Sequence, residues 1–164
     1  MDFESVVEQY GNSIVKYCYN LLWDHHEAYD AAQEVFLTAM MKQSILRDSA
    51  SLTPWLYRIA YNICIDELRR RRRAKLFLSR EIVRSEAETY VDNYDFGISS
   101  ELLKALNTLS AKDRALVFNR VVDEMDFTQI EAIYGIKSST LRKRYERARK
   151  KLGKELRKEA HYRE

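Results

Sequence analysis

Residues 126–152 read DFTQIEAIYGIKSSTLRKRYERARKKL, and this stretch decides the fold of the C-terminal part of the chain. Thr128, with Glu131 three residues later, predicts a capping box at the start of a short helix. Gly135 supplies the positive φ that ends this helix, and Ser138 predicts the cap of the next one. Two helices joined by so tight a turn form a helix-turn-helix pattern.

The predicted second helix carries an excess of positive charge. Leu141 and Tyr145 lie on one face of it, and residues 137–158 contain eleven basic residues against Glu146 and Glu155. A helix that is only solvated usually interleaves both signs, so a plain αα-hairpin is the weaker interpretation. The charge favours a helix that enters the major groove of DNA.

The composition indicates an all-α fold. The chain has 164 residues, 46% of them hydrophobic and 12% aromatic, which is enough for one domain or two small ones. One proline, four glycines and long stretches without turn signals favour helices over a sheet. The formal net charge of +3 is small, so positive charge acts through local clusters.

The cysteines and the N-terminus bear on the compartment. Cys18 and Cys64 stand apart without CxxC spacing, which predicts reduced, buried thiols and neither a disulfide nor a zinc site. No basic region followed by an apolar run opens the sequence, and no segment approaches membrane-spanning length. We therefore expect a cytoplasmic protein.

The first 42 residues predict two amphipathic helices. The first extends from Asp2 to Leu22, and Asp24 caps the second, which ends near Lys42. The polar face of the second helix carries His26, Asp30, Gln33 and Glu34. Three interpretations of this face are considered. It is an acidic surface that binds a basic partner protein, a stripe of metal ligands, or a plain solvated surface. Helical metal sites take ligands from several helices, and no second Glu-x-x-His appears, so the partner surface is preferred and no metal is expected.

A polar loop over residues 43–53 leads to a strong helix start, with Thr53 as cap and Pro54 in the first turn. The predicted buried stripe of this long helix is Trp55, Leu56, Ile59, Ala60, Ile63 and Leu68. A different face carries Arg58, Asn62, Asp66, Arg69, Arg70 and Arg73, at steps of three or four residues.

The long helix ends in five consecutive arginines, residues 69–73. Five in a row surround a helix, so at least two have no partner within the chain, and a phosphate backbone is their natural counter-charge. A solvated helix end stabilised by its own dipole is the alternative. Tyr57 and Tyr61 upstream, with Trp55, favour nucleic acid, because aromatic rings stack on unpaired bases.

The sequence changes character over residues 79–100, where acidic residues outnumber basic ones and Asn93 and Gly97 interrupt any helix. We interpret this stretch as a linker between two domains, residues 1–78 and 101–164.

Two more helices are predicted before the helix-turn-helix. The first spans Leu102 to Leu109. Ser110 and Asp113 predict a capping box for the second, which ends near Glu124. Its predicted apolar face consists of Ala115, Leu116, Phe118, Val121 and Val122.

Three segments resemble the extracytoplasmic-function (ECF) group of bacterial sigma factors, in order and spacing. Residues 29–37, YDAAQEVFL, resemble the pattern D-x-x-Q-E-x-F-L, and residues 55–70, WLYRIAYNICIDELRR, resemble W-L-Y-R-I-A-x-N-x-x-I-D-x-L-R-R. Residues 135–144, GIKSSTLRKR, with residues 147–152, RARKKL, resemble G-I-S-x-x-T-V-K-S-R followed by R-A-R-K-K-L. The likeness covers nearly the whole chain.

The resemblance implies a sigma factor that directs core RNA polymerase to specific promoters. Its implied parts are sigma domain 2 in residues 1–78 and sigma domain 4 in residues 101–164. Core RNA polymerase, promoter DNA and an anti-sigma factor are the implied partners, without enzymatic activity, cofactor or small-molecule substrate. The implied polymerase-binding residues are Asp30, Gln33, Glu34 and Phe36.

The resemblance also implies two sets of DNA-binding residues. Those for the −10 promoter element are Ser49, Ser51, Arg58, Tyr61, Asn62, Arg69, Arg70 and Arg73. Those for the −35 element are Ser138, Ser139, Thr140, Arg142, Lys143 and Arg147.

Two positions depart from the family's pattern. Glu131 stands where the family usually has a small alanine, and its carboxylate must either pair with a basic residue such as Arg144 or tilt the two helices apart. The loop from Asp48 to Thr53 lacks the family's usual aromatic residue, so the family's preference for a flipped promoter base does not carry over.

Two other classes of protein fit parts of the pattern. One is a stand-alone helix-turn-helix regulator whose N-terminal domain binds a ligand or dimerises. The other is a carboxylate-metal helical enzyme, in which His26 or Glu34 would hold the metal. No nucleophile, acid-base pair or phosphate loop is apparent, and the three histidines are interpreted as surface residues.

Overall fold

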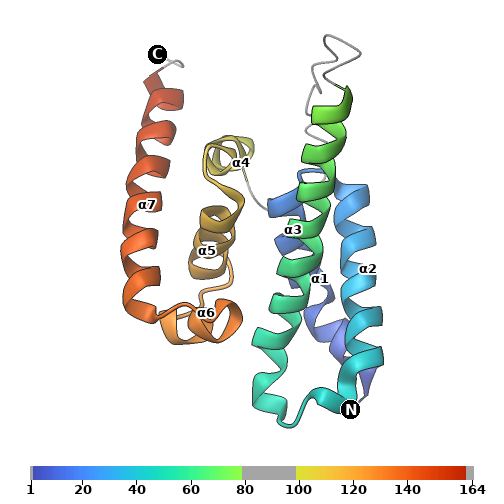
Figure 1. Cartoon of the computed structure of the whole chain (residues 1–164). Coiled ribbons are helices and arrows are strands. Elements are labelled where there is room, and N and C mark those ends of the chain that lie inside the picture. The colour runs from blue at the N-terminus through green and yellow to red at the C-terminus, as the bar shows by residue number, and fades with distance from the viewer. Residues whose placement is uncertain (1, 79–98, 162–164) are drawn as a thin grey trace.

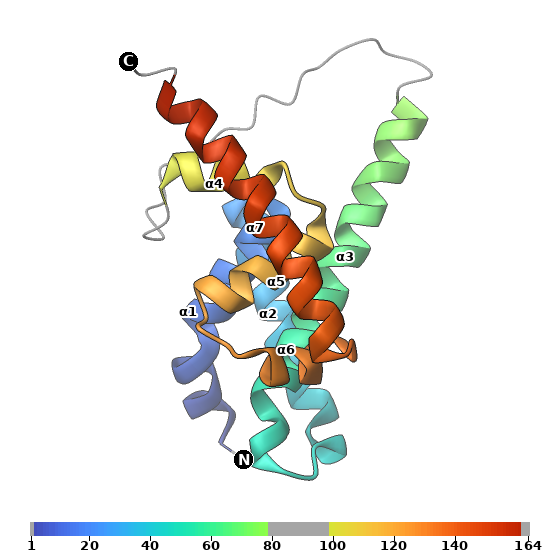
Figure 2. The same cartoon turned by 90° about the vertical axis from the view of Figure 1, so that its left-hand side faces the viewer.

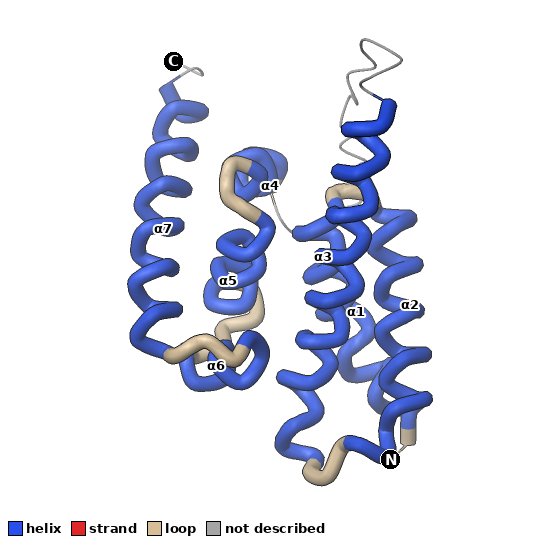
Figure 3. The backbone as a smooth tube through the Cα atoms, in the orientation of Figure 1, coloured by secondary structure: helices blue, strands red, loops and turns tan. Residues whose placement is uncertain are grey.

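The computed structural model describes residues 2–78 and 99–161, and in these ranges it consists of helices joined by short turns, with no strand (Figures 1 and 3). The all-α prediction is therefore confirmed. Most of the predicted linker, residues 79–98, lies outside the described residues. The helical regions on either side of it are described below in turn.

Three long helices make up the first region. They are α1 (Phe3–Leu22), α2 (His25–Lys42) and α3 (Leu52–Leu78), and two short 3₁₀ helices, Gln43–Ile45 and Ser49–Ser51, connect the last two. The predicted cap of α2 is confirmed, since Asp24 accepts a hydrogen bond from the backbone N–H of Glu27 (2.9 Å). Asp2, which was predicted as the first residue of its helix, caps α1 by accepting a hydrogen bond from the backbone N–H of Glu4 (3.1 Å). The two helix starts therefore follow from local sequence.

The start of α3 differs from the prediction. The helix begins at Leu52, so Thr53 lies within its first turn and does not cap it. The Thr53 hydroxyl is instead hydrogen-bonded to the Tyr10 hydroxyl of α1, at 2.7 Å. A contact with a distant helix has replaced the local capping role.

Four helices make up the second region: α4 (Ser100–Asn107), α5 (Ala111–Val121), α6 (Phe127–Tyr134) and α7 (Ser138–His161). The last two form the predicted helix-turn-helix, and α7 runs diagonally across the front of the molecule in Figure 2. Gly135, at φ 67°, ends α6 as predicted.

The capping box of α6 was predicted two residues too late. Asp126 accepts a hydrogen bond from the backbone N–H of Gln129 (2.8 Å), and the Gln129 side chain accepts one from the backbone N–H of Asp126 (2.9 Å). Thr128 and Glu131 lie inside the helix. With Asp126 as the cap, α6 begins at Phe127, and its residues Ile130 and Ile133 are buried in the core.

The α5 helix is shorter than predicted. It ends at Val121, and Glu124 adopts a positive φ of 55° in the turn that follows. Val121 and Val122, predicted as core, are 53% and 37% exposed. Ser110 does cap this helix, because its hydroxyl accepts from the backbone N–H of Asp113 at 3.3 Å.

The two regions pack against each other, α5 against α1 and α6 against α3. One cluster of buried apolar side chains continues from the first region into the second. The Tyr17 ring of α1 lies at its centre, edge-on to Tyr57 of α3 (5.1 Å between centroids) and to Phe118 of α5 (6.1 Å). The shared core fixes how the surfaces described next are arranged.

Candidate nucleic-acid and partner interfaces

The polar side chains predicted on α2 form an exposed surface. Asp30, Gln33 and Glu34 are exposed, whereas Phe36 is only partly exposed and packs against the core. Phe36 also borders a mostly apolar groove of about 310 Å³ between α1 and α2, whose opposite edge includes Val7. The α2 surface therefore combines carboxylates with an apolar groove beside them.

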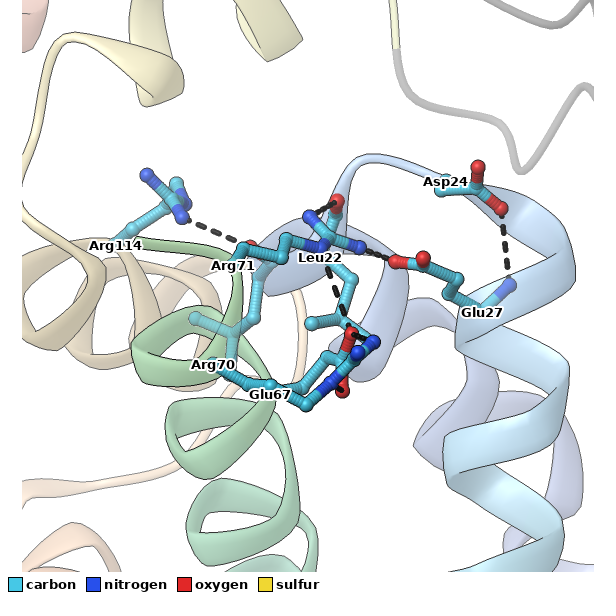
Figure 4. Close-up of polar contacts among 8 residues, drawn as sticks. Leu22, Asp24, Glu27, Glu67, Arg70, Arg71 and Arg114 are labelled. Atoms are coloured by element: carbon cyan, nitrogen blue, oxygen red, sulfur yellow. Dashed lines mark hydrogen bonds and ion pairs between the residues drawn. The ribbon is translucent and has the colours of Figure 1, made fainter. Parts of the chain in front are cut away.

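The arginine run divides into inward and outward members. Figure 4 shows Arg71 reaching from α3 to the end of α1, where it donates to the Leu22 carbonyl at 2.7 Å. The same guanidinium forms ion pairs with Glu27 of α2 and with Glu67 (3.7 Å). Arg71 thus joins three helices, and burial lowers its pKa.

The predicted phosphate contacts in this run remain at the surface. Arg70 binds Glu67 through two hydrogen bonds of 3.0 and 2.6 Å, yet its side chain is 68% exposed. Arg69 approaches Asp66 at 3.4 Å, and both of these side chains are exposed. Arg73 is exposed as well.

A buried arginine, Arg114, was not predicted from the sequence. Arg114 of α5 is 6% exposed, and it donates to the carbonyls of Asn20 (2.8 Å), Leu21 (3.0 Å) and Leu109 (3.2 Å). Burial lowers its pKa to about 10. Together with Arg71, it satisfies the carbonyl groups at the end of α1 from both regions of the chain. No motif marks this residue, because its partners are backbone atoms far away in sequence.

The predicted −10 face of α3 is partly covered by α6. Arg58 donates to the carbonyls of Ile133 (2.9 Å) and Ala132 (2.6 Å) at the end of α6. The Tyr61 ring is edge-on to Tyr134, with 5.1 Å between centroids.

The remaining predicted −10 residues lie around this contact. Asn62 is exposed and borders a cavity of about 320 Å³ that Lys112 and Arg144 line from the second region. Ser49 and Ser51 are exposed in the 3₁₀ turn before α3. Tyr57, predicted as a base-stacking ring, is 2% exposed and belongs to the core, so that prediction is wrong.

A chain of polar side chains crosses the boundary between the two regions. Tyr134 donates to the Asn119 side-chain oxygen, so the 2.9 Å contact between Tyr134 and Tyr17 has Tyr17 as its donor. Asn119 donates to the Asp123 carboxylate at 2.9 Å, and Tyr57 hydrogen-bonds to the same carboxylate. Burial raises the pKa of Asp123 to about 6, although both hydrogen bonds act in the opposite direction.

Glu131 is paired differently from the prediction. Its carboxylate accepts a hydrogen bond from the backbone N–H of Ser138 at 2.9 Å and a second one from the Ser138 hydroxyl. These two hydrogen bonds lower the pKa of Glu131. Arg144, the predicted partner, instead pairs with Asp113 at 3.1 Å. The Ser138 hydroxyl is therefore a donor, and Glu131 satisfies the start of α7 in its place.

The predicted −35 residues lie on the outer side of α7. Ser139, Thr140, Arg142, Lys143 and Arg147 are exposed, whereas Leu141 is buried. Ser138 is partly exposed at the first position of the helix. Since Glu146 and Arg147 share a shallow groove with Arg142 and Lys143, this surface is strongly basic with a single carboxylate.

The histidines only partly follow the prediction. His25 is 8% exposed, and its ring lies 4.2 Å from that of His26, so it is not a surface residue. Within residues 2–78 and 99–161, no three His, Cys, Asp or Glu side chains gather as they would around a metal ion. Cys18 and Cys64 are buried free thiols, as predicted. The described helices include none that is long and apolar enough to span a membrane.

Comparison with known proteins covers both regions. Residues 6–74 match the family Sigma-70 region 2, and residues 99–152 match the family Sigma-70, region 4. The ECF RNA polymerase sigma factor SigW of Bacillus subtilis is 30% identical over 94% of this chain and 89% of its own length. The RNA polymerase sigma factor CarQ of Myxococcus xanthus is 32% identical over 77% of this chain and 75% of its own length.

A solved structure has the same arrangement. The sigma factor RpoE from Bartonella quintana, in complex with the anti-sigma factor NepR, matches with a TM-score of 0.79 and 25% identity, over 95% of this chain and 97% of its own. The helix-turn-helix, the basic outer side of α7 and the sequence matches on both sides of residues 79–98 agree. The chain therefore belongs to the ECF group of RNA polymerase sigma factors.

Proposed function

We propose that this sigma factor directs core RNA polymerase to specific promoters by using α2 to bind polymerase and α3 and α7 to bind DNA. Sigma factors as a family bind core RNA polymerase and promoter DNA and are not enzymes. The observation that carries the assignment is the opposed placement of two charged surfaces. Helix α7, which exposes the basic side chains, and helix α2, which exposes the acidic ones, lie at opposite edges of the molecule (Figure 1).

The outer side of α7 suits the major groove at the −35 element. The first turns of the helix expose two hydroxyl groups, from Ser139 and Thr140, and two cations, from Arg142 and Lys143. Arginine and lysine favour guanine there, because its O6 and N7 atoms are both acceptors. Arg147, one turn further along, is placed to contact the phosphate backbone.

The exposed face of α2 suits a basic surface of polymerase. Asp30, Gln33 and Glu34 supply acceptors, and the groove beside Phe36 supplies apolar area. Charge on the rim of such an interface speeds association and selects the partner, while the apolar centre contributes most of the affinity.

The end of α3 suits the −10 element. Arg69, Arg70 and Arg73 are exposed and can hold the phosphate backbone while the strands separate. Arg58 and Tyr61 meet α6 in this structure, so their use on DNA requires α6 to move away from α3. An extruded base would then lie beside Asn62, at an unstacking cost of a few kcal/mol.

An anti-sigma factor is the proposed regulator, and the cytoplasm, where core polymerase works, is the proposed compartment. The structural match to a sigma factor in complex with its anti-sigma factor supports the first point. Both regions of the chain take part in that match, so the proposed regulator would hold them together.

Transcription with purified core polymerase tests the proposal. Core plus this chain is expected to initiate at a subset of a promoter library at which core alone is inactive. Equal initiation with and without the chain across the library would refute it. A regulator of the stand-alone helix-turn-helix type would instead bind duplex DNA tightly without polymerase.

A further inference from the structure

Phe127, the first residue of α6, lies against two arginine side chains. The guanidinium carbon atoms of Arg120 and Arg142 are each 5.1 Å from the centre of its ring. The Tyr145 ring is edge-on to the same ring, at 5.7 Å between centroids. Phe127 is partly exposed and packs against the core, so its ring is fixed in place from behind.

The backbone around Phe127 is fixed relative to α7. The Ser138 hydroxyl, which donates to Glu131, also lies 3.3 Å from the Phe127 carbonyl, and Glu131 accepts from the Ser138 backbone N–H at 2.9 Å. Arg142 lies four residues after Ser138, on the same side of α7. The start of α7 and the Phe127 ring therefore keep a constant position relative to each other.

The two arginines at the ring differ in what else holds them. Arg120 donates to the Met125 carbonyl at 3.0 Å, which fixes it from the other end. Arg142 is exposed and, within residues 2–78 and 99–161, has no hydrogen bond or ion pair. Contact with the face of the ring leaves the N–H groups at the guanidinium edge free, because they point outward in the guanidinium plane. The Arg142 side chain is thus oriented without using its donors.

Arg144 provides the contrast on the same helix. It pairs with Asp113 at 3.1 Å, and its side chain is only 25% exposed. Its donors are directed at a carboxylate of the same chain and away from the outer side of α7. The ring contact distinguishes an arginine that is presented to a ligand from one that is used in folding.

We propose that Phe127 is a positioning residue for −35 recognition, and that its ring holds the Arg142 guanidinium in the orientation in which it reads a base edge. This inference rests on the proposed assignment of Arg142 to base reading. An arginine that is already oriented loses less conformational freedom when it binds, so discrimination between bases improves more than general affinity for DNA.

Phe127→Leu tests the inference, since leucine keeps an apolar side chain at the core but offers no aromatic face. The assay uses the full chain with core polymerase and a promoter taken from a randomised library, together with its single-base variants at −35. We expect a roughly two- to fivefold loss of discrimination at one base position, the range of an exposed cation–π contact. Discrimination at the other positions and the slope of affinity against salt are expected to be unchanged.

Matched variants separate the possible failures. Phe127→Tyr keeps the aromatic face and is expected to retain wild-type discrimination. Arg142→Ala is expected to abolish the preference at the same position, and adding Phe127→Leu to it is expected to have no further effect. Should Arg142→Ala leave every base ratio unchanged, the base-reading assignment itself is wrong. Should Arg142→Ala act while Phe127→Leu changes nothing or weakens all sequences equally, only the positioning role is wrong.

Folding is checked separately. The unfolding midpoint of each variant is measured, and Phe127→Met serves as a second ring-free variant, because a methionine fills irregular space with little strain. The same position-specific loss in both ring-free variants supports the role of the ring. A loss that follows the drop in stability and is uniform across DNA sequences overturns it.

Discussion

At the scale of single residues, Glu131 shows how a local departure is accommodated. A carboxylate in the middle of α6 looked costly from the sequence, because the position usually holds a small residue. In the structure the carboxylate is partly exposed and binds the Ser138 backbone N–H and hydroxyl at the start of α7. Negative charge at the start of a helix is favourable, so the departure strengthens the turn.

Replacing Glu131 tests this role. Glu131→Ala removes the acceptor at the start of α7, so we expect a lower unfolding midpoint at pH 7. The hydrogen bonds lower the pKa of this carboxyl group, so its contribution is present above the ordinary glutamate value, near pH 4.3, and is lost as pH falls through the lowered folded-state value. Thermal unfolding at pH 7 and at pH 2.5 measures the difference. Glu146→Ala on the exposed side is the control, and an equal loss at both pH values contradicts the assignment.

Glu34 offers a second test at this scale. It is exposed on the proposed polymerase surface, so Glu34→Lys reverses a charge without removing a packed side chain. We expect polymerase binding to weaken at least tenfold, as like charges meet across the interface, with an unchanged unfolding midpoint. Titration with core polymerase measures the affinity. If the variant binds core polymerase with wild-type affinity, the polymerase-binding surface lies elsewhere on the molecule.

Residue roles were predictable only where the partner is close in sequence. Asp24 was identified as a cap because an N-cap acceptor and its donor lie within three residues. The capping box of α6 was placed two residues too late because Asp126 with Gln129 and Thr128 with Glu131 fit the same pattern, and only the hydrogen bonds of Asp126 and Gln129 decide between them. Arg114 was missed because its partners are carbonyls of another helix.

At the scale of elements, the arginine run of α3 combines a structural role with a proposed role in DNA binding. Arg71 joins the end of α1, at Leu22, to the start of α2, at Glu27. Arg73, two residues later, is exposed. The sequence predicted that the chain could not pair all five arginines. It could not indicate which one turns inward, because that depends on where α1 ends in space.

A pair of alanine variants separates these functions. Arg71→Ala leaves the Leu22 carbonyl and Glu27 without their partner, so we expect a loss of about 1 to 3 kcal/mol in the free energy of unfolding. Arg73→Ala is expected to change it by less than about 0.5 kcal/mol, as is usual for a surface position. Arg73→Ala is instead expected to reduce the salt dependence of promoter binding by about one ion. Urea unfolding measures the first effect and salt titrations of promoter binding measure the second. A loss of stability in Arg73→Ala, with a loss of salt dependence only in Arg71→Ala, would contradict the prediction.

At the scale of the whole molecule, the packing of the two regions is the least predictable feature. The sequence indicates two helical domains with a linker between them, and those domain boundaries stay a prediction. Tyr17, Tyr57 and Phe118 were assigned to separate helices with no indication that they share a core. Contacts between residues far apart in sequence leave no periodic signal in either helix.

The partly buried Asp123 is expected to make the stability of this packing depend on pH. It faces Lys16 of α1, Tyr57 of α3 and Tyr134 of α6, and its pKa is raised to about 6. The folded chain therefore binds this proton more tightly than the unfolded chain does, so the contribution of Asp123 to stability is greatest at low pH and falls as pH rises from about 4 to 6. The free energy of unfolding is therefore lower at pH 7, where Asp123 is charged, than at low pH, where it is protonated, by up to about 3 kcal/mol.

Asp123→Asn tests this dependence. The amide keeps an acceptor for Tyr57 and Asn119 but carries no charge, so we expect the variant to be more stable than wild type at pH 7 and nearly equal to it at pH 4. Urea unfolding between pH 4 and pH 7 measures both curves. A difference that stays constant over this range would show that Asp123 does not titrate there.

The contact between Arg58 and the end of α6 has a consequence for binding equilibria. On the proposed assignment, the face of α3 that α6 covers would bind DNA only in the fraction of molecules in which α6 has moved away, and the apparent dissociation constant would then be the intrinsic one divided by that fraction. A partner that binds only the separated form raises this fraction without touching either Arg58 or the DNA. Linkage then makes the effect mutual: DNA held at Arg58 strengthens the attachment of that partner by the same factor.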